Sequence, residues 1–150
     1  MGCTERTTER PAGHPIAMIL AITRAFLNQP MSTVLVVEDS LPQREMITEL
    51  LRGIGLTVTV ASDGMEALEQ MQSQRPDMVV LDIVMPRMNG YELCRRIKAD
   101  PSTQNVPVVM CSSKGEEFDR YWGMKQGADA YITKPFRPAD MISTVKQLLR

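Results

Sequence analysis

The chain has 150 residues, of which 43% are hydrophobic and 23% are charged, as in ordinary soluble globular proteins. Its 17 basic and 18 acidic side chains give a formal net charge of −1. This balance argues against a nucleic-acid binder, which needs a basic surplus. The three cysteines, Cys3, Cys94 and Cys111, are far apart and form no Cys-x-x-Cys pair, which argues against a disulfide scaffold or a structural zinc site. We therefore expect one self-sufficient domain in a reducing compartment.

Residues 1–30 differ from the rest of the chain. Their one apolar stretch, residues 16–27, contains Arg24 and is shorter than the roughly 20 residues that span a bilayer, so we expect no membrane span. No targeting pattern is present in this segment. We expect an extension that is disordered or not native, with Met31 as the natural start; the alternative is a short amphipathic helix that docks on a partner or a membrane surface.

From residue 33 onward, short apolar runs alternate with helical patterns. Continuous apolar runs predict strands buried on both faces, whereas the alternation at residues 56–60 predicts a half-exposed edge strand. The predicted strands are 34–37, 56–60, 78–81, 106–110 and 130–133. Apolar residues three and four positions apart predict five helices, located at 41–53, at 65–74, around Leu93 and Ile97, around Phe118 to Lys125, and around Met141 to Leu149.

Five strand–helix units predict an α/β domain over residues 31–150, with a parallel five-stranded sheet covered by helices on both faces. The methionines at core spacing, Met46, Met65, Met71 and Met78, are expected to fill the core. We also expect Phe118 to be a core residue.

Polar residues follow four of the predicted strands. Glu38 and Asp39 follow the first strand, Asp82 the third, Ser112 and Ser113 the fourth, and Lys134 the fifth. In an open parallel sheet, ligands bind beyond the carboxyl ends of the strands. Three carboxylates held close together repel one another, so they favour a site for a hard divalent cation, for which Mg²⁺ fits better than zinc.

Three segments resemble those of response-regulator receiver domains: LVVEDS at 35–40, VLDIVMP at 80–86 followed by Asn89-Gly90, and GADAYITKPF at 127–136. The resemblance covers residues 31–150. It implies a doubly wound, flavodoxin-like sheet with strand order 2-1-3-4-5. It also implies that Asp82 accepts a phosphoryl group from a histidine kinase, so the protein takes part in its own phosphoryl transfer and autodephosphorylation without being an enzyme.

The resemblance also implies roles for other residues. Glu38, Asp39 and Asp82, with the backbone carbonyl of Val84, would hold Mg²⁺. Lys134 would contact the phosphoryl group and form a cis peptide with Pro135. Ser112 takes the place of the switch hydroxyl of the family and Tyr131 that of its switch aromatic.

Residues 118–127, FDRYWGMKQG, resemble stand-alone receivers of pilus-based twitching motility and phototaxis, relatives of the chemotaxis receivers. This resemblance implies a cytoplasmic single-domain regulator in chemotaxis-like or type IV pilus motility. A chemotaxis-type sensor histidine kinase would act on it. Its output would be a downstream motor or regulatory protein that binds the face built from the fourth helix, fifth strand and fifth helix of the domain.

Other classes fit less well. A haloacid dehalogenase-type hydrolase would have an aspartate where Val84 stands, and no phosphate-binding glycine loop occurs. The remaining alternative is a phosphorylation-independent protein-interaction module on the same fold, which is weakened because every residue that phosphorylation needs is present.

Overall fold

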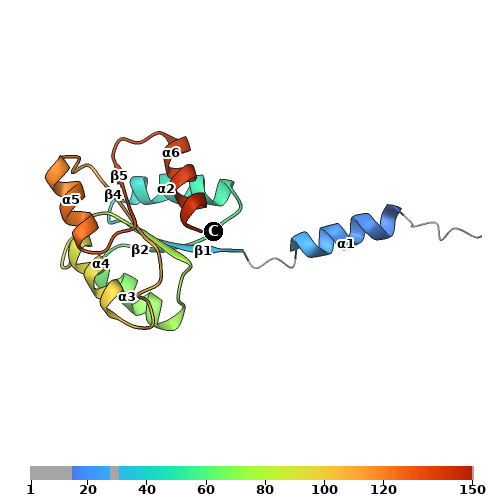
Figure 1. Cartoon of the computed structure of the whole chain (residues 1–150), viewed down its shortest axis with the longest axis horizontal. Helices are drawn as coiled ribbons and strands as arrows, with labels where there is room; N and C mark the ends of the chain where they lie inside the picture. The colour runs from blue at the N-terminus through green and yellow to red at the C-terminus, as the bar shows by residue number, and fades with distance from the viewer. Residues whose placement is uncertain (1–14, 28–30, 150) are drawn as a thin grey trace, which may run out of the picture. The chain divides into compact units, whose positions relative to one another are not determined.

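Figure 1 shows the computed structural model of the chain, which describes residues 15–27 and 31–149. The chain divides into two compact units, residues 1–30 and 31–150. In the first unit, α1 spans Pro15–Leu27, and the side chains of residues 15–23 are exposed. Predictions that concern residues 1–14 and 28–30 lie outside the described part of the chain. None of the helices in the described residues is both long and apolar enough to cross a membrane.

The second unit alternates strands and helices, as the sequence predicts. Its strands are β1 (Thr33–Val37), β2 (Thr57–Ala61), β3 (Met78–Leu81), β4 (Val108–Ser112) and β5 (Ala130–Thr133). Its helices are α2 (Leu41–Gly53), α3 (Gly64–Ser73), α4 (Gly90–Ala99), α5 (Glu117–Lys125) and α6 (Pro138–Leu148). The strands form one sheet in the order β2-β1-β3-β4-β5, and all pairs are parallel. The doubly wound fold and the 2-1-3-4-5 order are confirmed.

The sheet separates two apolar cores because successive residues of a strand point to opposite faces. In β1, Val34 and Val36 pack with the buried residues of α2 and α6, whereas Leu35 and Val37 pack with those of α3 and α4. Figure 1 shows α2 and α6 together on one side of the sheet and α3 and α4 on the other. Both faces of β1 are therefore covered, which explains its uninterrupted run of apolar residues.

Side-chain caps fix where two helices begin near the carboxyl edge of the sheet. The carboxylate of Asp63 accepts a hydrogen bond from the Glu66 N–H at 2.9 Å, and the Asn89 side chain accepts one from the Glu92 N–H, also at 2.9 Å. These caps satisfy backbone donors that the first helical turn leaves unpaired. Because Asn89 lies seven residues after Asp82, its cap determines where the loop that follows β3 ends.

Three predictions about packing were wrong. Met46 and Met65 are about half exposed, because other residues form the buried faces of their helices, whereas Met71 and Met78 are buried as expected. Phe118 is 71% exposed instead of being a core residue. The reason is that α5 buries only Gly123, so its backbone approaches the sheet closely and its aromatic side chains lie outside.

The fourth strand also begins and ends two residues later than predicted, at Val108 and Ser112. Ser112 is therefore the last residue of β4, whereas the prediction placed it after the strand. In the parallel ladder it pairs with Thr133 of β5, so Lys134 leaves the sheet directly beside Ser112. This pairing places Ser112 and Lys134 at the same end of the sheet.

Candidate functional site

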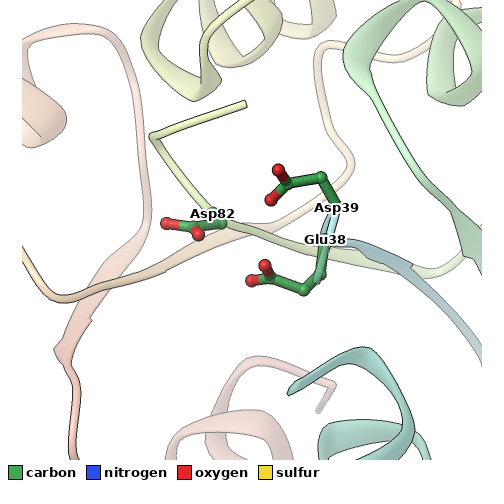
Figure 2. A group of neighbouring side chains, drawn as sticks. All are labelled: Glu38, Asp39 and Asp82. Atoms are coloured by element: carbon green, nitrogen blue, oxygen red, sulfur yellow. The ribbon is translucent and has the colours of Figure 1, made fainter. Parts of the chain in front are cut away.

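The site lies at the carboxyl ends of β1 and β3, which are neighbours in the sheet. Val37 pairs with Leu81 in the ladder, so Glu38 and Asp82 leave adjacent strands at the same level. Figure 2 shows Glu38, Asp39 and Asp82 projecting from these strand ends toward one space. Each of the three contributes a carboxylate oxygen, and these oxygens all lie within 4.8 Å of one another. The structure thus brings together the three acidic residues that the sequence analysis selected.

Two of these carboxylates are withdrawn from solvent and are held by hydrogen bonds. Glu38 is 2% exposed, and its Oε1 accepts a hydrogen bond from the Ser40 N–H at 3.1 Å. The side chain of Asp82 is 13% exposed, and its Oδ1 accepts one from the Ile83 N–H at 2.6 Å. Asp39 is exposed at the rim. Asp82 also lines a cavity of about 390 Å³, together with Ser113.

Lys134 bridges the two buried carboxylates. Its Nζ lies 2.8 Å from Glu38 Oε2 and 3.5 Å from Asp82 Oδ2, and its side chain is 12% exposed. Burial alone would lower the pKa of Lys134, but the hydrogen bond to Glu38 and the charge of Asp82 outweigh it and raise this pKa. Lys134 therefore stays protonated. The peptide bond between Lys134 and Pro135 is cis, as predicted.

Glu38 is under opposing influences. Burial raises its pKa above the ordinary value of 4.5, and the nearby charge of Asp82 raises it further, although the hydrogen bond from Lys134 acts in the opposite direction. A carboxylate cluster of this kind gains from a bound cation, which removes the repulsion between its negative charges.

The donor set fits magnesium. Three carboxylate oxygens converge, and no histidine or cysteine is part of this cluster, which matches the preference of Mg²⁺ for oxygen ligands. The exposed position of Asp39 leaves one side of the cluster open to water, and Mg²⁺ keeps several waters when bound to proteins. Val84 lies in the loop after β3 with an exposed side chain. A role for its carbonyl oxygen as a metal ligand stays a prediction.

The two residues that the family resemblance implies as a switch, Ser112 and Tyr131, lie on β4 and β5, the next two strands of the sheet after β3. Ser112 is fully buried, and its Oγ accepts a hydrogen bond from the Lys114 N–H at 3.3 Å. Tyr131 is 8% exposed, and its hydroxyl donates a hydrogen bond to the Lys114 carbonyl oxygen. Both side chains thus contact the same residue of the β4–α5 loop, which connects the site to α5.

Sequence reasoning missed Gln43 in the first turn of α2. Its side-chain oxygen accepts a hydrogen bond from Lys134 Nζ, and it lines the same cavity as Asp82 together with Met46 and Phe136. A neutral polar residue on a helix has no sequence signature, and Lys134 lies 91 positions away along the chain. Only its place four residues after Asp39, at the carboxyl edge of the sheet, could have indicated it.

Comparison with known proteins identifies the class to which this fold and site belong. Residues 34–146 match the model of the response regulator receiver domain family. The chain belongs to this family, whose members receive phosphoryl groups on an aspartate in two-component systems.

Three similar proteins illustrate the range of the family. The DNA-binding response regulator MtrA of Mycobacterium tuberculosis is 42% identical over 117 residues, which are 78% of this chain and 50% of that protein. The chemotaxis response regulator CheY4 of Vibrio cholerae is 30% identical with a TM-score of 0.75, covering 79% of this chain and 99% of that one. The receiver domain of the sensor histidine kinase PA1611 from Pseudomonas aeruginosa is 28% identical with a TM-score of 0.74, covering 80% of this chain and 98% of that one. That structure contains a magnesium ion coordinated in the active site cleft.

This chain spans about half the length of MtrA, and the same holds for the phosphate regulon regulator PhoB of Pseudomonas aeruginosa. Their names describe whole proteins. The similarity to MtrA therefore does not show that this chain binds DNA.

Proposed function

We propose that this chain is a phosphorylation-controlled switch of a two-component system, in which Asp82 is the phosphoacceptor. The observation that carries the proposal is the position of Asp82: its carboxylate lies between two acidic neighbours and the Lys134 ammonium, and it faces a cavity of about 390 Å³. This cavity provides room for a phosphoryl donor beside a nucleophilic carboxylate.

The residues of the site have separate tasks in the transfer. An oxygen of Asp82 forms a bond to phosphorus while the bond between phosphorus and the donor histidine nitrogen breaks, and the imidazole leaves with the electron pair and takes up a proton. Glu38, Asp39 and Asp82 would hold Mg²⁺, which would neutralise charge on the phosphoryl oxygens. Lys134 supplies a fixed positive charge to a further oxygen, and the Ser112 hydroxyl supplies a hydrogen-bond donor.

The signal would leave through the surface formed by α5, β5 and α6, which we call the output face. The support is the pair of contacts from Ser112 and Tyr131 to Lys114, a residue of the loop between β4 and α5. The exposed side chains of Phe118, Tyr121 and Trp122 on α5 give a partner protein an apolar surface to contact.

For the pathway, we propose chemotaxis-like or type IV pilus motility in the cytoplasm, with a chemotaxis-type histidine kinase as donor. The residues 118–127 and the structural similarity to CheY4 support this proposal. The second candidate is control of transcription, which the higher identity to MtrA favours. The rates at which each histidine kinase of the same organism phosphorylates this chain distinguish the motility proposal from the transcription proposal. A chemotaxis-type kinase is expected to be the fastest donor, and a preference for a kinase of a transcriptional system would contradict the motility proposal.

The test of the switch itself uses acetyl phosphate and intact-mass measurement. The chain is expected to gain one phosphoryl group only when magnesium is present, and Asp82→Asn is expected to gain none. Equal uptake by the Asn variant would contradict the assignment of Asp82. An absence of uptake by the unaltered chain would favour the alternative, a phosphorylation-independent interaction module.

A further inference from the structure

We propose that Gln43 is a positioning residue for phosphoryl binding: it holds the Lys134 ammonium group at the place where the phosphoryl oxygens arrive. This inference rests on the proposed function of Asp82 as phosphoacceptor.

The hydrogen bonds of Lys134 carry the first step. An ammonium group has three donors and no acceptor. In this structure Lys134 Nζ has three hydrogen-bond partners, which are Glu38, Gln43 and Asp82. The amide of Gln43 must turn its oxygen toward Nζ, because its NH₂ group cannot accept a hydrogen bond. All three donors of the ammonium group thus have a protein partner, although the Lys134 side chain is largely buried and has little contact with water.

The three contacts differ in strength. The contact with Asp82, at 3.5 Å, is at the limit of a hydrogen bond, whereas Glu38 lies at 2.8 Å. Glu38 and Gln43 both belong to the segment that runs from the end of β1 into the first turn of α2. This segment therefore fixes the position of Nζ, and the weak contact with Asp82 is the one that a phosphoryl oxygen would replace.

Magnesium makes Gln43 the more important of the two strong partners. Glu38 belongs to the carboxylate cluster that fits the metal, and a cation bound there would neutralise its attraction for the ammonium. Gln43 is uncharged and is not part of the cluster. Its hydrogen bond with Lys134 can persist when the metal is bound, which is the state in which the phosphoryl group is held.

The test measures the affinity for beryllofluoride, a stand-in for the phosphoryl group, in saturating magnesium. Gln43→Met keeps the length of the side chain and removes the acceptor. We expect its Kd for beryllofluoride to rise about fivefold, which is the loss of affinity that corresponds to the net free energy of one hydrogen bond. Leu50→Met is the matched control, because it places the same new side chain on the same helix at a residue that packs against the core and does not line the cavity. Its Kd is expected to stay within twofold of that of the unaltered chain.

A double-mutant cycle shows whether Gln43 acts through Lys134. In the Lys134→Ala background, Gln43→Met is expected to have no further effect on the Kd, since the partner is gone. An unchanged Kd in Gln43→Met, or a fivefold loss that persists in the Lys134→Ala background, would overturn the proposal. Failure of the unaltered chain to bind beryllofluoride would instead contradict the proposed function, so the two failures are distinguishable.

Discussion

The hydroxyl group of Tyr131 on β5 donates a hydrogen bond to the backbone carbonyl of Lys114, two residues after Ser112. The ring of Tyr131 is buried, and burial raises the pKa of its hydroxyl to about 12. Gly123 of α5 lies against the same ring, where an added Cβ would come within 3.0 Å of it. Tyr131 therefore connects β5, the β4–α5 loop and α5 through one side chain.

Tyr131→Phe removes this hydrogen bond and keeps the ring. We expect the free energy of unfolding to fall by about 1 kcal/mol, the net value of one hydrogen bond in a protein. Urea denaturation measures this change. An unchanged denaturation midpoint would show that the Lys114 carbonyl finds an equivalent partner in water.

Trp122 is expected to report on the output face. It is the only tryptophan of the chain, is 43% exposed, and stacks on Phe118 with ring centroids 6.4 Å apart. Movement of α5 would change this stacking, so beryllofluoride with magnesium is expected to change the intensity or the emission maximum of its fluorescence. The change is expected to disappear in Asp82→Asn and to decrease in Ser112→Ala. An unchanged spectrum, with beryllofluoride binding proven independently, would mean that the signal leaves by another face.

The sheet and the acidic site could be predicted because both depend on short-range patterns. Apolar runs define the strands, and residues that follow parallel strands must gather at one edge. The burial of individual helix residues was less predictable. Helical spacing placed Phe118 on an apolar stripe, but the contact of α5 with the sheet is made by Gly123, whose missing side chain carries no hydrophobic signal. Contacts such as that between Gln43 and Lys134 depend on tertiary structure alone.

Residues 1–30 are expected to be dispensable for the function of residues 31–150. The chain divides between residues 30 and 31, and the second unit has its own two apolar cores. A chain that begins at Met31 is expected to keep the melting temperature of the full chain and its uptake of phosphate from acetyl phosphate. A fall of several degrees would contradict this expectation, since it would mean that residues 1–30 stabilise the domain.

Asp63 is expected to contribute to acid sensitivity. The hydrogen bond from the Glu66 N–H lowers the pKa of Asp63 below its ordinary value of 3.8, and the ion pair with Arg87 lowers it further. The folded protein thus binds fewer protons at this carboxylate than the unfolded chain does. The resulting stability is present above pH 3.8 and is lost as the pH falls from there toward the lower pKa of the folded state.

Asp63→Asn retains a capping side chain that does not titrate in this range. The decrease in the urea midpoint between pH 7 and pH 3 is expected to be smaller in this variant than in the unaltered chain. Asp140→Asn, at an exposed ion pair with Arg137, is the control and is expected to leave the decrease unchanged. An equal decrease in Asp63→Asn and the unaltered chain would show that Asp63 contributes nothing to acid unfolding.

Gly90 is expected to be essential for the geometry of the phosphoacceptor. It begins α4 directly after the Asn89 cap, and its N–H donates a hydrogen bond to the Ile83 carbonyl at 2.8 Å. A Cβ at this position would lie 2.2 Å from the carbonyl oxygen of Asp82 and 2.8 Å from the Cα of Ile83. Both are backbone atoms, so α4 and the end of β3 would have to move apart. Gly90→Ala is therefore expected to lower the free energy of unfolding by about 3 kcal/mol, at the upper end of overpacking costs, and to weaken beryllofluoride binding.

Gly53→Ala provides the matched control for Gly90→Ala. Gly53 is the last residue of α2, and nothing lies within 4 Å of where its Cβ would stand. Because alanine favours the helix and restricts the unfolded chain, this variant is expected to be as stable as the unaltered chain or more stable by up to about 1 kcal/mol. Urea denaturation and beryllofluoride titration of both variants check the pair. If Gly90→Ala matched Gly53→Ala in both measurements, the close approach of α4 to Asp82 would not be what holds the phosphoacceptor in place.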